Sequence, residues 1–236
     1  MLKQIPKKIT PDPIVDSIVE LRFTSSIPKE AILGQFLNLL LPRYPQIRNH
    51  NIPEEIRQKE EFRYAVELTL LNSFFSVGIG INVITFNCVN GYKGWSIYFE
   101  EIKYVLTLIG NESIFSSFER IGIRYVNFFK NILNITNSLD LNIQFHDQEY
   151  YQTQQTIFVT QLIRNGFSHR LQVSENAILN GVINGSLVDI DTYTTNVPAN
   201  VGDDLYELIK QTREEEKLLF FSLLKSDFVE QFHPEY

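Results

Sequence analysis

The spacing of apolar residues in the first half of the chain switches between two periods, and this switching limits the possible folds. In residues 14–23, apolar and other side chains alternate, which predicts a strand with two different faces. Behind Pro28 the apolar residues recur at helical spacing instead, so we expect a helix that ends near Pro42. The runs 62–70 and 75–89 alternate again and predict a second and a third strand.

A second predicted helix and a fourth predicted strand complete the first half of the chain. Apolar residues at helical spacing begin at Trp95 and predict a helix of about four turns, and residues 118–129 alternate as a fourth strand. The order strand–helix–strand–strand–helix–strand is that of a ferredoxin-like unit, with both helices on one face of a four-stranded sheet. Gly78 and Gly80 within the third strand indicate a bulge or a close approach of another backbone segment.

The second half has a different pattern, with strand-like runs followed by one long helix. The helix begins at Asp203 or Asp204, extends to about Leu224 and is followed by a short turn of helix from Ser226. Glu214–Glu216 is interpreted as the solvated face of this helix. The expected strands lie near residues 141–151, 154–164, 167–174 and 186–194.

The whole chain is therefore expected to be an α+β protein. Its first half, 1–132, is predicted to be the ferredoxin-like βαββαβ unit, and its second half, 133–236, to be antiparallel β-structure closed by the long C-terminal helix. Periodicity leaves open whether the halves hold two sheets or share one sheet and one core.

Composition excludes several classes of protein. A net charge of −7 over 236 residues, with no basic run, argues against binding to a nucleic-acid backbone. We expect a cytoplasmic protein without a membrane segment, because the N-terminus has no apolar signal core and no run of 18 apolar residues exists. The one cysteine, Cys88, rules out a disulfide within the chain and fits a reducing compartment.

The predicted helix-free face of the first sheet is the candidate site. If the alternation is in register, this face carries Glu20, Arg22, Arg63, Glu67 and Arg124. In a ferredoxin-like sheet the first and fourth strands are neighbours, so Glu20 and Arg22 would lie beside Arg124. Three interpretations stay open: an ion pair between strands, a network that docks the second half, and a floor that binds anions.

No motif for catalysis or for a cofactor is present in the sequence. It contains no P-loop, no G-x-S-x-G elbow and no H-E-x-x-H, so we predict neither a cofactor nor a metal. The weak metal alternative would bring His146, Asp147 and Glu149 together with Asp189 and Asp191. These absences weaken an enzyme assignment without excluding it, because active sites are assembled in space.

Several segments, taken together and in order, resemble a sporadically distributed family of uncharacterised bacterial proteins. The most specific of them is Arg120–Asn127, which reads R-x-G-x-R-Y-x-N. The resemblance implies a stand-alone bacterial protein without an established activity, and it places Glu20, Arg22, Arg124 and Asn127 at shared positions. The other segments are D-P-I at 12–14, E-L-R-F at 20–23, Trp95, D-I-D at 189–191 and the Phe-rich last helix.

The sequence thus favours a non-catalytic binding protein. We expect an accessory factor whose partner is another bacterial protein, such as a toxin or a defence effector, or a second copy of the chain. The alternative is a sensor or enzyme for an anionic small molecule, bound in a cleft between the halves. In that alternative Arg22 and Arg124 would hold the ligand.

Overall fold

The first strand shows how the alternation in the sequence becomes two different faces. We analysed a computed structural model, which describes residues 4–110, 114–141 and 156–236. In strand β1 (Ile14–Thr24), Val19, Leu21 and Phe23 are fully buried, whereas Glu20 and Arg22 between them are half-buried. The strand predicted over 14–23 is confirmed, and its apolar face lies in a core.

The described residues form an α+β protein with nine strands, five α-helices and two short 3-10 turns. The other strands are β2 (Gln46–Asn49), β3 (Leu68–Leu71), β4 (Phe75–Ile79), β5 (Val83–Cys88), β6 (Ser117–Lys130), β7 (Ile157–Arg164), β8 (Phe167–Leu179) and β9 (Ile183–Thr194). The helices are α1 (Lys29–Leu40), α2 (Glu54–Arg57), α3 (Trp95–Gly110), α4 (Asp203–Leu223) and α5 (Ser226–Glu230), and the 3-10 turns are η1 (Glu60–Phe62) and η2 (Ile135–Ser138).

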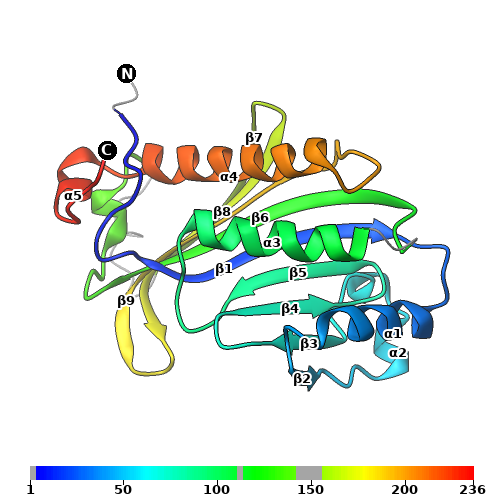
Figure 1. The fold of residues 1–236 in the computed structure, drawn as a ribbon. Helices are drawn as coiled ribbons and strands as arrows, with labels where there is room; N and C mark the ends of the chain where they lie inside the picture. Colours follow the sequence, from blue (N-terminus) through cyan, green and yellow to red (C-terminus); the bar gives the residue numbers. More distant parts are fainter. Residues whose placement is uncertain (1–3, 111–113, 142–155) are drawn as a thin grey trace. The chain divides into compact units, whose positions relative to one another are not determined.

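The strands belong to one sheet in the order β2-β3-β4-β5-β1-β6-β9-β8-β7 (Figure 1). Strands β1 and β6 are neighbours, as the sequence predicted for the first and fourth strands. The prediction of a four-stranded ferredoxin-like sheet is wrong, because the third predicted strand is the two strands β4 and β5, β2 adds a further strand beyond β3, and β6 has β9 as its other neighbour. The question that periodicity left open is answered by one sheet of nine strands. An edge of a sheet offers unpaired backbone groups, and here strands from later in the chain pair with the edge that β6 would have left.

Two of the predicted strands have different bounds in the structure. The run 75–89 is a hairpin, because the chain turns back between β4 and β5 and the amide of Gly80 donates to the carbonyl of Val83 (2.9 Å). The run 62–70 is strand only from Leu68 onward, and η1 precedes it. The turn shifts the two-residue period by one position, since Ile79 pairs with Ile84, but Val83 and Ile84 are both apolar and hide this shift in the sequence.

The glycines of this hairpin allow a second backbone segment to lie against it. A Cβ atom on Gly80 would clash with the carbonyl oxygen of Ala65, and one on Gly78 would clash with the side chains of Thr85 and Val66. Of the two alternatives that the sequence left open, a bulge or a close backbone approach, the close backbone approach is confirmed at Gly80, whereas side chains lie against Gly78.

The described structure divides into two compact units, and neither is a continuous stretch of chain. Each unit draws residues from both of the ranges 1–132 and 133–236. Unit 1 consists of residues 1–15, 124–192 and 213–236, and unit 2 consists of residues 16–123 and 193–212.

Unit 2 is built on aromatic packing beneath α1 and α3, which lie on the same side of its strands (Figure 1). Phe23 of β1 contacts Phe36 of α1 and the ring of Phe115, with ring centroids 6.4 and 4.8 Å apart. The carboxylate of Glu101 in α3 is buried and accepts hydrogen bonds from the Arg43 guanidinium and the Tyr44 hydroxyl. This pairing offsets the cost of burying the charge.

Unit 1 has its own core, in which α4 and α5 pack against strands. Phe129 of β6 lies at its centre, with its ring centroid 5.3 Å from that of Phe228 and 5.6 Å from that of Phe232. Helix α4 contributes three buried apolar residues at helical spacing to this core, and α5, which begins after α4 ends, contributes two more. These residues are Leu219, Phe220, Leu223, Phe228 and Val229.

One carboxyl group is buried on the inner side of α4. Glu216 is 2% exposed, and its Oε1 has no hydrogen-bond partner among the described residues. Burial raises the pKa of Glu216 to about 8. Glu216 was predicted to lie on the solvated face, and this is wrong, because it stands one helical turn before the buried Leu219 and Phe220.

No helix among the described residues is long and apolar enough to cross a membrane. The strand expected near 141–151 lies almost wholly outside the described residues. The other expected strands of the second half correspond to β7, β8 and β9, and the helix pair expected after residue 202 corresponds to α4 and α5.

We expect Gly80→Ala to lower the free energy of unfolding by about 2–3 kcal/mol, because the new methyl group meets backbone at Ala65 that cannot move cheaply. Gly34→Ala is the matched control. Gly34 lies on the exposed side of α1 with open space around it, so the same change should stabilise the protein by about 0.5–1 kcal/mol. Urea denaturation measures the free energy of unfolding of both variants. An equal effect of the two substitutions would contradict the close approach of Ala65 to Gly80.

We expect Glu216→Gln to remove a decline in stability between about pH 4.5 and 8. Over this range the unfolded chain has lost the Glu216 proton and the native protein still holds it, so unfolding becomes easier as the pH rises. The variant should be more stable than the parent by about 3–5 kcal/mol at pH 8 and nearly equal to it at pH 4. Denaturant midpoints across this range measure the difference, and a gap that does not change with pH would refute it.

Candidate functional site

A guanidinium group lies across the backbone of β6 and reaches the neighbouring strand β1. The guanidinium of Arg120 donates to Oε1 of Glu20, and its side chain is only 11% exposed. It lies where a side chain at position 122 would be, since a Cβ atom on Gly122 would clash with Nη1 of Arg120. The glycine in the R-x-G-x-R motif thus leaves room for the first arginine.

The same carboxylate is held by a second arginine from its own strand. Nε of Arg22 lies 2.7 Å from Oε1 of Glu20. The guanidinium of Arg22 stacks over the ring of Tyr64, 4.2 Å from its centroid, and that of Arg120 stacks over Tyr193 at 4.2 Å. Each arginine is therefore fixed by an ion pair on one side and an aromatic ring on another.

Tyr64, the ring under Arg22, also binds a second carboxylate, that of Glu119. The Tyr64 hydroxyl donates to Oε2 of Glu119 (2.8 Å), and Nη2 of Arg63 donates to Oε1 of Glu119 (3.0 Å). Burial and the bond to Glu119 raise the pKa of Tyr64, so this hydroxyl stays protonated and serves as a donor.

We call this set the arginine–tyrosine cluster. It contains three guanidinium groups, two carboxylates and two phenol rings, all within unit 2, and its arginines range from 11% exposed at Arg120 to 39% at Arg63. Its members are Glu20, Arg22, Arg63, Tyr64, Glu119, Arg120 and Tyr193.

The second arginine of the motif makes its contacts within unit 1. Arg124 donates from Nε and Nη2 to the two carboxylate oxygens of Asp189 on β9, at 2.8 and 2.6 Å. The Asp189 side chain is 4% exposed and that of Arg124 is 43% exposed. Nearby, the amide of Asn127 donates to the backbone carbonyl of Val188 (3.3 Å) and is buried.

The R-x-G-x-R motif therefore ties β6 to both of its neighbours. Arg120 and Arg124 stand four residues apart on the same side of the strand, and one binds a carboxylate of β1 while the other binds a carboxylate of β9. This arrangement makes cross-strand ion pairs part of the sheet on both sides of β6.

The structure pairs the sequence-predicted site residues differently from the prediction. Glu20 does lie between two guanidinium groups, but the second is that of Arg120, and Arg124 binds Asp189 instead. Arg120 has the same strand parity as Arg124, so the alternation could have identified it. The contributions of Tyr64, Glu119 and Tyr193 depend on the tertiary fold and left no signal in the sequence.

Glu67, also expected on this face, is fixed by other cations. Its Oε1 lies 3.3 Å from Nζ of Lys29 and 3.2 Å from Nε of Arg57. Beside it is a cavity of about 200 Å³ that extends to Arg63 of the cluster, and Arg57, Lys59 and Asn82 contribute to its wall. Its wall carries three cationic side chains and two carboxylates, Glu60 and Glu67, which pair with Arg63 and Arg57, so Lys59 is the cation that would contribute most to holding a small anion there.

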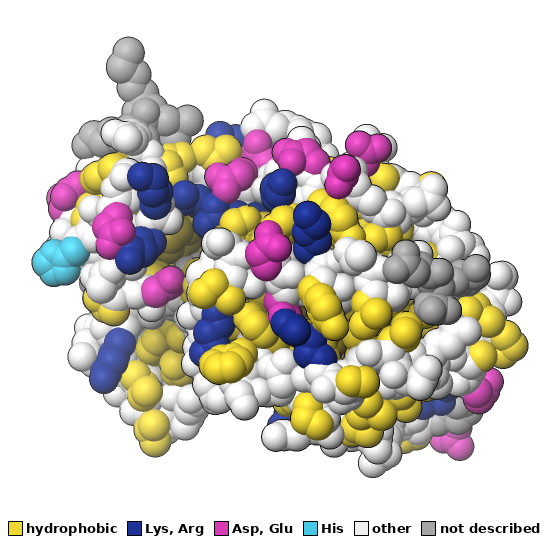
Figure 2. Space-filling model, in the orientation of Figure 1, with side chains coloured by type: hydrophobic (Ala, Val, Ile, Leu, Met, Phe, Trp, Pro, Cys, Tyr) yellow, Lys and Arg dark blue, Asp and Glu magenta, His cyan; other side chains and the backbone are white. Residues whose placement is uncertain are grey.

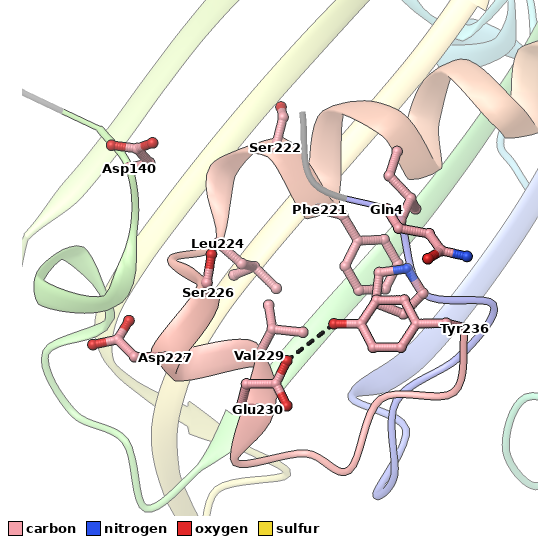
Figure 3. A pocket seen from close by; sticks show the side chains of 12 residues that line it. Gln4, Asp140, Phe221, Ser222, Leu224, Ser226, Asp227, Val229, Glu230 and Tyr236 are labelled. Carbon is pink, nitrogen blue, oxygen red and sulfur yellow. Dashed lines mark hydrogen bonds between the residues drawn. The ribbon is translucent and has the colours of Figure 1, made fainter. Parts of the chain in front are cut away.

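Unit 1 holds a larger cavity of about 520 Å³ beside α5 (Figure 3). Asp140, Asp227 and Glu230 give it an acidic lining, with apolar contributions from Phe221 and others. Two of these carboxylates are already used within the chain. Glu230 accepts a hydrogen bond from the Tyr236 hydroxyl (3.0 Å), and Asp227 accepts one from the amide of Phe228 (3.0 Å).

The part of the chain that the structure describes offers no cluster of metal ligands. No group of three or more His, Cys, Asp or Glu side chains there is placed to hold a metal ion. His146, Asp147 and Glu149 of the metal alternative lie outside the described residues. Burial raises the pKa of the Cys88 thiol, which makes it a poor nucleophile.

Charges on the helix-bearing face are mixed rather than gathered by sign. In Figure 2, the dark blue Lys and Arg side chains are interspersed with magenta Asp and Glu side chains. A nucleic-acid backbone would require a continuous basic stripe, and this face does not offer one.

A comparison of the chain with models of known protein families and with curated proteins found no match. The resemblance of residues 120–127 to a bacterial family therefore stays a prediction from the motif.

We expect Gly122→Ala and Glu20→Gln to have strongly non-additive effects on stability. The alanine methyl group displaces the Arg120 guanidinium from Glu20, so the second change then removes an ion pair that is already broken. The unfolding free energies of the two single variants and the double variant should give a coupling of about 1–2 kcal/mol. Simple additivity would show that Gly122 does not serve the Arg120–Glu20 pair.

Proposed function

We propose that the chain is a non-catalytic bacterial interaction protein, whose arginine–tyrosine cluster recognises an acidic segment of a partner protein. The observation that carries this proposal is the stacking of Arg22 and Arg120 on Tyr64 and Tyr193. Arginine and tyrosine, together with tryptophan, are enriched in the energetically dominant parts of protein interfaces.

The rigidity of the cluster supports the proposal. Binding costs conformational entropy for each long side chain that becomes ordered, and a side chain that is already held in place avoids most of that cost. Arg22 is held by Glu20 and Tyr64 while its side chain is 30% exposed, and Arg63 is held by Glu119 while 39% exposed. A partner therefore meets guanidinium groups that are ordered before it arrives.

The exposed guanidinium groups of the cluster favour an acidic partner. Arg22 and Arg63 are each paired with carboxylates of the chain, Arg63 with both Glu119 and Glu60, and their side chains are still 30% and 39% exposed, so each can also meet a carboxylate of a partner. Complementary charge of this kind contributes to specificity and to the association rate. A toxin or a defence effector of the same bacterium is the kind of partner that the resemblance implies.

The residue types in the cluster argue against catalysis there. Both carboxylates are occupied by guanidinium or phenol donors, and the hydroxyl that is bonded to one of them, that of Tyr64, has a raised pKa and is a weak nucleophile. Such a set can orient and bind an anionic group, and it lacks the parts for acid–base work.

A second function is favoured by one observation, the cavity of about 200 Å³ beside Arg63. Its cationic side chains, Arg57, Lys59 and Arg63, fit the alternative in which a small anionic molecule is sensed. Two predictions distinguish the alternatives.

We expect Arg22→Gln combined with Arg63→Gln to reduce partner recovery at least tenfold in affinity purification from the native bacterium. The matched control is Arg48→Gln with Lys130→Gln, which removes the same charge from exposed side chains elsewhere and should leave recovery unchanged. Thermal unfolding confirms that both variants fold. A partner that binds the cluster variant and the control equally would refute the proposal.

We expect nucleotides, sugar phosphates and inorganic polyphosphate to leave the melting temperature of the parent protein unchanged. A shift of several degrees that disappears in Lys59→Gln would instead support the small-anion sensor, because Lys59 lines the cavity and is not part of the cluster.

A further inference from the structure

Strand β7 is an edge of the sheet, and the described residues place no strand on its outer side. It pairs with β8 through a two-residue turn at Asn165–Gly166, where both residues have positive φ (51° and 81°). This is the geometry of a tight hairpin whose closing pair, Arg164 and Phe167, is hydrogen-bonded.

The hairpin fixes which backbone groups of β7 point outward. Hydrogen-bonded pairs alternate along an antiparallel ladder, so every second residue from Arg164 faces β8. The amides and carbonyls of the remaining residues point away from the sheet. These residues are Ile157, Val159, Gln161 and Ile163.

The side chains of the same residues are unusually apolar for an exposed edge. Ile163 is 80% exposed, Ile157 is 60% exposed and Val159 is 48% exposed. Between Ile157 and Ile163 there is no charge and no proline, which are the usual devices that prevent an edge strand from pairing. Phe158 and Leu162 on the other face are only partly buried against the core of unit 1.

The strand is also complementary to itself. A two-fold axis through Thr160 pairs Ile157 with Ile163 and Phe158 with Leu162, so that apolar residues meet apolar residues on both faces. It also pairs Val159 with Gln161, and Thr160 with Thr160. In this register the outward amides of one copy face the outward carbonyls of the other, as an antiparallel ladder requires.

We propose that β7 is a homodimerisation edge, at which two copies of this chain pair β7 with β7 in antiparallel fashion about Thr160. The pairing satisfies the outward backbone groups and covers the exposed isoleucines with those of the second copy. This interface is separate from the arginine–tyrosine cluster, so the two proposals stand or fall independently.

Analytical ultracentrifugation of the full chain at micromolar concentration tests the dimer. The parent should sediment with twice the chain mass of 27.5 kDa. Val159→Glu with Gln161→Glu places like charges directly opposite each other in the proposed register, so this variant should be monomeric. Ile178→Glu with Val182→Glu, which adds the same charge at positions 61% and 78% exposed, should remain dimeric.

A charge swap tests the register itself. Val159→Lys with Gln161→Lys should also be monomeric, and a mixture of the lysine and glutamate variants should form a heterodimer. Circular dichroism of each variant confirms folding. A monomeric parent, a dimer that survives the glutamate pair at 159 and 161, or a mixture that stays monomeric would each overturn the proposal.

Discussion

The two-residue period of β1 is the constraint on which the rest of the structure depends. It buries Val19, Leu21 and Phe23 completely, and it therefore directs Glu20 and Arg22 to the opposite face. The apolar face needs a cover, which α1 and α3 provide within unit 2. The other face is only half exposed, so its charges need partners in the protein, and Arg120 and Tyr64 supply them.

Strand β6 forms ion pairs of this kind with both of its neighbouring strands. Its two arginines bind Glu20 on one adjacent strand and Asp189 on the other, and the glycine between them makes room for the first. The pair of Arg120 is the better shielded of the two, because its guanidinium is 11% exposed and stacks on Tyr193, whereas Arg124 is 43% exposed. The contacts of Glu20, Tyr64 and Tyr193 hold the guanidinium groups of Arg22 and Arg120 at fixed positions in unit 2, and the proposed function relies on this order.

The sequence predicted those helices and strands whose apolar residues show a regular spacing within a single segment. The alternation around Leu21 gave β1 correctly, and the helical spacing around Leu219 gave α4. Glu216 shows the limit of this approach, because three consecutive glutamates indicate a solvated face although the helical period turns one of them inward. The close backbone approach was predicted correctly for Gly80, although the sequence could not identify the segment around Ala65 that approaches it.

The sequence by itself determined which side chains share a face, because that depends only on backbone period. It therefore placed Glu20, Arg22 and Arg124 on the helix-free side, and the same period puts Arg120 on the side of Arg124, which the prediction overlooked. Tertiary structure decided which of them meet. Strand order and register bring Arg120 to Glu20, Arg124 to Asp189, and Tyr193 over Arg120 from a position 73 residues further along the chain. Those contacts are set by the pairing of distant strands, which is a property of the whole sheet and of no single segment.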